Sequence, residues 1–533
     1  MTHPLPALTA LARAGAAGRA WDLFAAAGYL EQIADPATLA VKGRLLKGRG
    51  RLVYGSEQRA LFAEAAGAYA SAHSLDPAPY LAINAASLSL LAGDAARAAE
   101  GARGVMALLD APNTPTDTPY FLAATRAEAL LILGERAQAE TAMEAAAAHD
   151  PDGWADRAAT IAQLREIARA QGSDASWIER FAPPASLHFA GHMGLASGGA
   201  SEAALAKELD ALFAANRFGF AWGALAAGAD IVIAELLLTR GAELHVVLPC
   251  PPGQFEAQSV APAGEDWTGR YRTLLGAATS VRSAADSATS IHDPLATFHA
   301  GELAIGGALN NAAMLASGAA QLIVADEKGG GINTARQAGL WRASAGPQHC
   351  LTAPRDAQVE KLFPPEQPDP ARVLAVHLSA GLDALAGDGT LHSAAIEQLT
   401  APANAALAQL PPGSVRTAPG RWDAVVEDFD LALATARNLA ALGNVAVGAH
   451  LAIGPVLRDG PSGTLVPYGP APALARHLAA LAPAGVALVS DVLAVTLAAR
   501  GSDKVRSELY HLGENEAGGA IHTLVSQRLS RSA

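Results

Sequence analysis

The stretch SLHFAGHMGLASGG at residues 186–199, followed by GFAWGALAAGADIVIAELLLTRGAELHVVLP at 219–249, decides the fold of this chain. It predicts a strand, a glycine-bearing loop, a helix, a second Gly/Ala-rich loop, another helix and a buried strand. Gly241 ends the second helix. Strands that alternate with helices form a parallel sheet, which binds ligands at the carboxyl ends of its strands. The stretch therefore predicts an α/β domain with a ligand site in its loops.

A third strand and glycine loop complete the predicted site. Residues 320–326, AQLIVAD, predict a strand that ends in Asp326, and the three glycines 329–331 precede a helix that runs to about Arg342. Glycine lets the backbone approach a ligand closely, and a helix N-terminus offers N–H groups to an anion. Three such loops at successive strand ends indicate a phosphate or ribose pocket.

The candidate site residues follow from these loops. Asp326, at a strand end, and Glu235, on an otherwise apolar helix, are the candidate general acids or bases. The ligand-binding candidates are Gly191, His192, Gly194, Gly223, Gly228, Asp230, Gly329, Gly330, Gly331, Asn333 and Thr334.

Each polar candidate also has a structural interpretation. His192 either contacts the ligand or makes a structural hydrogen bond, and Asp230 either holds a ribose hydroxyl or caps the following helix. Glu235 is equally well explained as a paired buried acid. Thr334 contacts a phosphate or caps its helix.

Composition limits the function classes. A net charge of −13 and a pI near 5.6 argue against a nucleic-acid-binding protein. The two cysteines, Cys250 and Cys350, allow neither a disulfide framework nor a zinc motif, so we expect no metal site and a reducing compartment. Without a signal-type segment or an apolar run of about 18 residues, we expect a cytoplasmic protein that binds no membrane.

Residues 1–175 predict helices throughout. Alanine dominates, and the chain is cut at likely turn positions, namely Asp35-Pro36, Asp76-Pro77, Gly93-Asp94, Pro112–Pro119, Gly134 and Asp150-Pro151. Small residues at helical spacing let paired helices approach closely. The segment from Ala68 to Asp94 resembles the tetratricopeptide-like (TRAFs-binding type) domain of bacterial signalling proteins, which implies a solenoid that binds a protein partner. A plain helical bundle is the alternative.

Residues 186–355 resemble the SLOG superfamily of Rossmann-like nucleotide-processing or nucleotide-sensing domains. The shared blocks are Gly191–Gly194, Gly223–Glu235 and Gly329–Thr334. The resemblance implies a nucleotide or nucleotide-derived ligand. Phosphoribohydrolases of this group carry Pro-Gly-Gly-x-Gly-Thr followed by Glu, whereas this chain has Asp326-Glu-Lys-Gly-Gly-Gly-Ile-Asn-Thr. That departure puts hydrolase activity in doubt, but not binding.

Residues 371–533 look like a class III adenylate/guanylate cyclase homology domain of α+β, ferredoxin-like fold. The block Gly448–Val456, Tyr468-Gly469 and Gly485–Ser490 carry the resemblance. Such enzymes hold two metal ions on two carboxylates. Here the first carboxylate position falls on His377 and the second near Arg421, while the later Asn and Arg positions fall on Ala473 and on Arg476 or His477. A shift of two residues would restore Asp423 or Asp383.

The resemblances together imply a multidomain signalling protein. It would bind a partner through its helices, a nucleotide-derived ligand in its α/β domain, and form a homodimer through a catalytically inactive cyclase-like domain. The first alternative is a nucleotide hydrolase that cleaves an N-glycosidic or phosphate bond. The second is a residual nucleotide cyclase.

Overall fold

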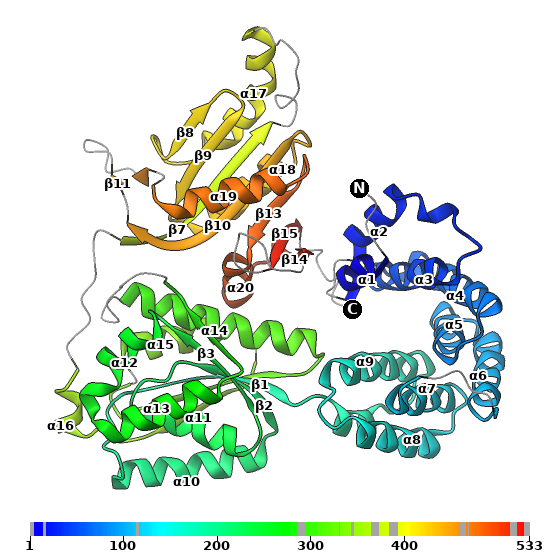
Figure 1. The fold of residues 1–533 in the computed structure, drawn as a ribbon, viewed down its shortest axis with the longest axis horizontal. Helices are drawn as coiled ribbons and strands as arrows, with labels where there is room; N and C mark the ends of the chain where they lie inside the picture. The colour runs from blue at the N-terminus through cyan, green and yellow to red at the C-terminus, as the bar shows by residue number, and fades with distance from the viewer. Residues whose placement is uncertain are drawn as a thin grey trace. The chain divides into compact units, whose positions relative to one another are not determined.

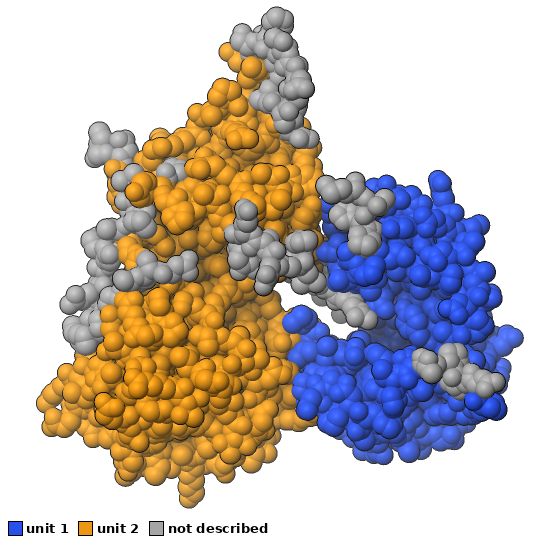
Figure 2. Space-filling model, in the orientation of Figure 1, with its two compact units in different colours: residues 1–183, 314–317 blue, residues 184–313, 318–533 orange. Residues whose placement is uncertain are grey.

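The chain folds into two compact units (Figures 1 and 2). The first comprises residues 1–183 with 314–317, and the second comprises residues 184–313 with 318–533. The computed structural model describes residues 5–13, 17–112, 117–285, 294–329, 331–342, 346–363, 372–382, 393–455, 457–458, 465–466, 468–511 and 520–526. No described helix combines the length and the apolar character needed to cross a membrane.

The described part of the first unit is helical, as the sequence predicts. Its elements are α1 (Leu5–Arg13), α2 (Ala17–Ala26), η1 (Tyr29–Glu31), α3 (Pro36–Gly50), α4 (Gly55–Leu75), α5 (Pro79–Ala92), α6 (Ala95–Leu109), α7 (Pro119–Ile132), α8 (Arg136–His149), α9 (Trp154–Gln171) and η2 (Ser176–Phe181). The helices begin and end at the predicted breakers. Asp35, for example, accepts a hydrogen bond from the Thr38 N–H at 2.8 Å, which caps α3.

Small residues let neighbouring helices of this unit approach closely. A Cβ atom on Gly43 would lie 2.7 Å from the Tyr69 ring, so only glycine allows α3 and α4 to pack at this distance. Two apolar clusters fill the space between successive helices, one centred on α3–α5 and one on α5–α9. These short-range pairs fit a helical repeat, and the tetratricopeptide-like assignment stays a prediction.

The second unit begins with a six-stranded parallel sheet of order β4-β3-β2-β1-β5-β6. Its strands are β1 (Ala185–Gly191), β2 (Phe218–Gly223), β3 (Glu243–Leu248), β4 (Ser280–Ser283), β5 (Ala319–Ala325) and β6 (Gln348–Thr352). The helices among them are α10 (Ala200–Ala215), α11 (Ala229–Thr239), α12 (Pro252–Ser259), η3 (Ala261–Ala263), α13 (Glu265–Ala277), α14 (Pro294–Met314), α15 (Ile332–Trp341) and α16 (Ala357–Glu360). The chain order reverses between β1 and β5, which is where such sheets open a crevice.

Successive side chains of a strand point to opposite faces of the sheet, so the helices that they contact lie on two faces. Leu187 and Phe189 of β1 pack with α10, α11 and α13. Ala190 of the same strand and Ile323 of β5 pack with α15, while Val247 of β3 packs with α14. The apolar stretch Leu303–Ser317 predicts a helix, but α14 begins earlier, at Pro294, and ends at Met314.

The prediction was wrong for the strand β2. The segment Phe218–Gly223 was expected to be part of a Gly/Ala-rich loop, but it forms β2 between β1 and β3. Its two glycines obscure the apolar run, yet Phe220 and Ala221 are buried in the sheet core. The predicted loop is therefore shorter and covers only the residues after Gly223.

A seven-stranded mixed sheet of order β14-β15-β13-β10-β7-β9-β8 follows. Its strands are β7 (Arg372–Leu382), β8 (Val415–Ala418), β9 (Arg421–Val426), β10 (Val445–Pro455), β13 (Ala487–Ser490), β14 (Val505–His511) and β15 (Ile521–Ser526), and β11 (Leu457–Arg458) pairs with β12 (Leu465–Val466). The helices are α17 (Ser393–Leu407), α18 (Phe429–Ala440), α19 (Pro470–Leu481) and α20 (Asp491–Arg500). The sequence predicts three of these strands, one that begins at Arg372 and two at Asn444–Ala449 and Val486–Val489, which correspond to β7, β10 and β13.

Helix α14 also packs against α20 within this second unit. A Cβ atom on Gly306 would lie 2.1 Å from the Val495 carbonyl oxygen, so the two helices meet backbone to backbone. The Arg500 guanidinium binds the buried Glu302 carboxylate, with Nε 2.6 Å from Oε1 and Nη2 3.2 Å from Oε2. Arg282 of β4 pairs with Asp491 at 2.9 Å.

Candidate functional site

A cavity of about 250 Å³ lies at the carboxyl ends of the central parallel strands. Gly191 at the end of β1, Gly223 at the end of β2 and Pro249 after β3 contribute to its wall. Helix α14 adds Thr297, Ala300, Gly301 and Ala304, and the start of α15 adds residues 331–334. The cavity thus occupies the crevice that the reversal of strand order opens.

The first glycine loop forms one rim of this cavity. His192 is buried and bound at both ring nitrogens, because its Nε2 lies 2.9 Å from the Ala353 carbonyl and its Nδ1 accepts the Gly194 N–H at 3.1 Å. His192 lines the cavity and holds the loop, so the structural hydrogen bond accounts for it. Gly194 lies beside the cavity, where a Cβ atom would be 2.7 Å from Arg355 Cγ.

Asp230 ties the first loop to the second. It is buried in the first turn of α11 and lines the cavity, and its Oδ1 accepts the Gly191 N–H at 2.7 Å. Its Oδ2 lies 3.4 Å from the Ala226 N–H, a weaker contact. Burial raises the pKa of Asp230 to about 7, against the opposing effect of the two N–H groups. Asp230 therefore connects the two loops and does not cap α11.

The glycines of the second loop are required by close backbone contacts. A Cβ atom on Gly223 would lie 2.7 Å from the Phe189 carbonyl oxygen. Gly228 has a φ of 112° and would place a Cβ atom 2.8 Å from the His192 carbonyl oxygen. Gly223 lines the cavity, whereas Gly228 supports the loop behind it.

The third glycine loop leads into α15 at the opposite rim. Gly331 is the N-cap of α15, with a φ of 92° and no side-chain cap, and it lines the cavity together with Asn333 and Thr334. Gly329 lies outside the lining, and Gly330 falls outside the described residues. The first turn of α15 carries no acidic residue, so its positive end faces the cavity without a built-in counter-charge.

Asp326 is bound to an arginine that the sequence did not single out. Arg355 Nε lies 2.6 Å from Asp326 Oδ2, and the Lys328 N–H donates to Oδ1 at 2.9 Å. Burial would raise the pKa of Asp326, but the hydrogen bond and charge of Arg355 outweigh it and keep that pKa below its usual value. Arg355 lines the cavity and Asp326 lies behind it.

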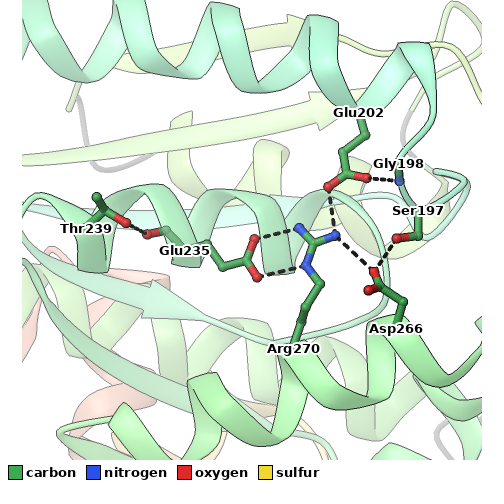
Figure 3. A network of polar contacts seen from close by, with 7 residues as sticks. All are labelled: Ser197, Gly198, Glu202, Glu235, Thr239, Asp266 and Arg270. Carbon is green, nitrogen blue, oxygen red and sulfur yellow. Dashed lines mark hydrogen bonds and ion pairs between the residues drawn. The ribbon is translucent and has the colours of Figure 1, made fainter.

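Glu235 lies apart from the cavity, in the ion-pair network of Figure 3. Arg270 of α13 holds both of its carboxylate oxygens, at 2.8 and 2.5 Å, and also contacts Glu202 of α10 at 2.7 Å. The network ties α10, α11 and α13 together on one face of the sheet. Glu235 is therefore a paired acid, as the structural interpretation predicts, but its side chain is 35% exposed rather than buried.

His188 is a further polar residue of the cavity, and the sequence predicts it only as part of a strand. His188 of β1 lines the cavity, is fully buried and stacks on Trp341 at a ring distance of 6.3 Å. Burial lowers its pKa to about 3, so it is neutral. Its one sequence signal is a polar residue in the middle of an otherwise apolar strand.

The candidate residues between 371 and 533 lie on the second sheet and on helix α19. His377 of β7 pairs in register with His450 of β10, and burial lowers the pKa of each to about 4. Arg421 begins β9, and Asp423 is bound by Arg476 of α19 at 3.0 Å. Ala473 and His477 lie on α19, while Asp383 falls outside the described residues.

Among the residues that the structure describes, no three His, Cys, Asp or Glu side chains come together as a set that could hold a metal ion.

Comparison with known proteins gives a partial likeness to solved structures. No family model and no curated protein matches the chain. The chain is similar to the catalytic core of a rhodopsin-guanylyl cyclase with converted specificity in complex with ATPalphaS, at 15% identity over 29% of this chain and 96% of that one, with a TM-score of 0.24. It is similar to the adenylyl cyclase CyaB from P. aeruginosa at 14% identity, over 30% and 96% of the two chains, with a TM-score of 0.23. Its likeness to the guanylyl cyclase Cya2 has 11% identity, covers 30% and 94%, and has a TM-score of 0.23.

Proposed function

We propose that the cavity at the β1/β5 reversal binds a nucleotide or nucleotide-derived ligand. The observation that carries this proposal is the convergence of two glycine loops, the uncapped N-terminus of α15 and the Arg355 guanidinium on one cavity. A helix N-terminus and an arginine together suit an anionic group such as a phosphate. The resemblance of residues 186–355 to the SLOG superfamily supports the same ligand class.

Binding has stronger support than hydrolysis. A general acid or base must reach the bond that it cleaves. Asp326 is bound to Arg355 and does not line the cavity, and Glu235 is held by Arg270 outside it. The proposal therefore treats Asp326 as the residue that positions Arg355, and it assigns Glu235 a structural role.

We extend the proposal to a signalling protein in which the other regions regulate. The helical region would bind a protein partner, and the cyclase-like region would act as a catalytically inactive, dimerising module. His377 at the first carboxylate position and the pairing of Asp423 with Arg476 support the loss of cyclase activity. Formation of a cyclic nucleotide from ATP or GTP with Mg²⁺ or Mn²⁺ would contradict this part.

The binding test uses isothermal titration calorimetry of the full chain with ATP, AMP, cyclic AMP, NAD and ADP-ribose. We expect at least one of them to bind, and Arg355→Gln to weaken that binding about 10- to 100-fold, because a charged hydrogen bond to the ligand is lost. Failure of every probe to bind the wild-type chain would overturn the proposal.

Asp326→Asn is the matched control for this variant. It breaks the same ion pair but leaves the Arg355 charge in place. We expect it to weaken binding of the probe much less than Arg355→Gln does, because Arg355 loses a positioning contact but keeps its charge. Equal losses in the two variants would mean that the ion pair acts through loop structure rather than through contact of Arg355 with the ligand.

A further inference from the structure

Three glutamines fix the protonation of His188 at the floor of the cavity. Gln348 Nε2 donates to the Ala338 carbonyl at 3.1 Å and to Gln321 Oε1 at 2.6 Å. Gln321 Nε2 then donates to the Gln337 carbonyl at 3.2 Å and lies 3.0 Å from His188 Nδ1. Backbone carbonyls only accept, so both amides have one orientation. His188 Nδ1 must accept, and its proton lies on Nε2.

The Nε2–H of His188 has no acceptor among the described residues. His188 is fully buried, and its Nε2 has no hydrogen-bond partner in this part of the structure. The Gln337 side chain comes close enough to His188 to raise its pKa as a hydrogen-bond partner would, but no Gln337 atom meets the distance and angle of a hydrogen bond at Nε2. A buried donor without a partner is costly, so such a group points to an acceptor supplied from the cavity.

The position of His188 sets how deep that acceptor lies. His188 precedes Gly191 by three residues, which places it about 10 Å below the rim along the strand. Ala300, Gly301 and Ala304 of α14 and Val247 of β3 give the cavity small or apolar side chains elsewhere in its lining. A volume of 250 Å³ falls below the ~300–1,000 Å³ of drug-sized ligand sites. One ring system suits this space better than a dinucleotide.

We infer that His188 determines specificity for the base of a bound mononucleotide, by donating its Nε2–H to an acceptor on the inner edge of that base. This inference rests on the proposed function, because the phosphate lies at the rim with Arg355 and α15. The ligand class is therefore a nucleoside monophosphate whose base turns a carbonyl oxygen or ring nitrogen towards β1. The Gln321 amide keeps the proton on Nε2, the ring nitrogen that has no hydrogen-bond partner among the described residues.

The test compares AMP, GMP, CMP and UMP with ribose 5-phosphate by calorimetry on the full chain. We expect at least one mononucleotide to bind more tightly than ribose 5-phosphate. His188→Phe keeps a ring of similar size but removes the donor, and should weaken that mononucleotide about 5- to 30-fold while leaving ribose 5-phosphate unchanged. His349→Phe, in a strand of the same sheet away from the cavity, should change neither affinity.

The possible results separate the inference from the proposed function. Unchanged mononucleotide binding in His188→Phe, or equal loss for both probes, overturns the inference and leaves the proposed function standing. Equal binding of ribose 5-phosphate and all four mononucleotides to the wild type also overturns the inference and leaves the proposed function standing. Failure of all five probes to bind the wild type overturns both.

Nuclear magnetic resonance of the wild-type chain tests the inference without any substitution. Long-range ¹H–¹⁵N spectra of the histidine side chains report the tautomer and the environment of each ring. We expect His188 to carry its proton on Nε2, and the tightest mononucleotide to shift that resonance whereas ribose 5-phosphate does not. A proton on Nδ1, or no shift with a bound mononucleotide, would overturn the inference.

Discussion

Asp230→Asn should become progressively more stable than the wild type as the pH rises from 4 to 7. The folded chain holds the Asp230 carboxyl with a pKa of about 7, whereas the unfolded chain ionises near the ordinary value of 3.8. Between these values the folded state binds more protons than the unfolded state, so the stability of the wild type falls as the pH rises. At about 1.4 kcal/mol per pH unit, the full window corresponds to about 4 kcal/mol.

Asparagine imitates the protonated acid at this position. Its Oδ1 can accept the Gly191 N–H, and its neutral amide avoids the cost of a buried charge. Hydrogen exchange of the β1 and β5 amides at several pH values measures the effect in this sheet alone, which suits a multidomain chain. A difference between variant and wild type that does not change with pH would contradict the prediction.

Asp326→Asn is a control in which the stability difference from the wild type should change with pH in the opposite direction. Arg355 keeps the pKa of Asp326 below its ordinary value, so the ionised carboxylate stabilises the folded chain above pH 3.8. That stabilisation is lost as the pH falls through the pKa of the folded state. The variant should therefore be less stable than the wild type at neutral pH and approach it in acid.

Arg500→Met should lower the stability of the second unit by about 3–5 kcal/mol at neutral pH. The Glu302 side chain is only 1% exposed, and Arg500 covers both of its oxygens. Burial alone would raise the pKa of Glu302, but His299 and Arg500 together keep it below its usual value. Without Arg500 the carboxylate must stay charged with one partner or take up a proton. The loss should therefore shrink at low pH.

Denaturant titration followed by hydrogen exchange of α14 and α20 tests this prediction. Arg272→Met is the matched control, because Arg272 forms an exposed ion pair with Glu256 and should contribute little. The double variant Glu302→Gln/Arg500→Met should recover part of the loss, since no buried charge is left. Equal effects of Arg500→Met and Arg272→Met would contradict the prediction.

Much of the parallel sheet could be predicted because its strands are short apolar runs bounded by glycine. The sequence predicts strands at Leu244–Leu248 and Ala320–Asp326, and the ends of both ranges lie within one residue of the ends of β3 and β5. The strand β2 was missed because Gly219 and Gly223 resemble loop residues. In the second sheet, β8, β9, β14 and β15 mix polar with apolar residues, and their pairing depends on partners far away in the sequence.

The candidate site was predictable only where local sequence carries the signal. Glycine loops at strand ends are local, and Gly191, Gly223 and Gly331 do line one cavity. The partner of a charge is not local. Arg355 reaches Asp326 from beyond β6, and Arg270 reaches Glu235 from α13, so neither pairing was visible in the sequence. The donor role of His188 depends likewise on glutamines of β5 and β6.

Helix α14 packs on both of its sides, and this limits where the chain can be truncated for experiments. One side of the helix forms the cavity wall, and the other covers α20 through Gly306, Glu302 and Leu303. A fragment that stopped after the parallel sheet would leave Glu302 in contact with His299 alone and expose the apolar surface that Val495 covers. Such a fragment would be prone to aggregation. Truncated forms of the chain should therefore keep both sheets on one polypeptide.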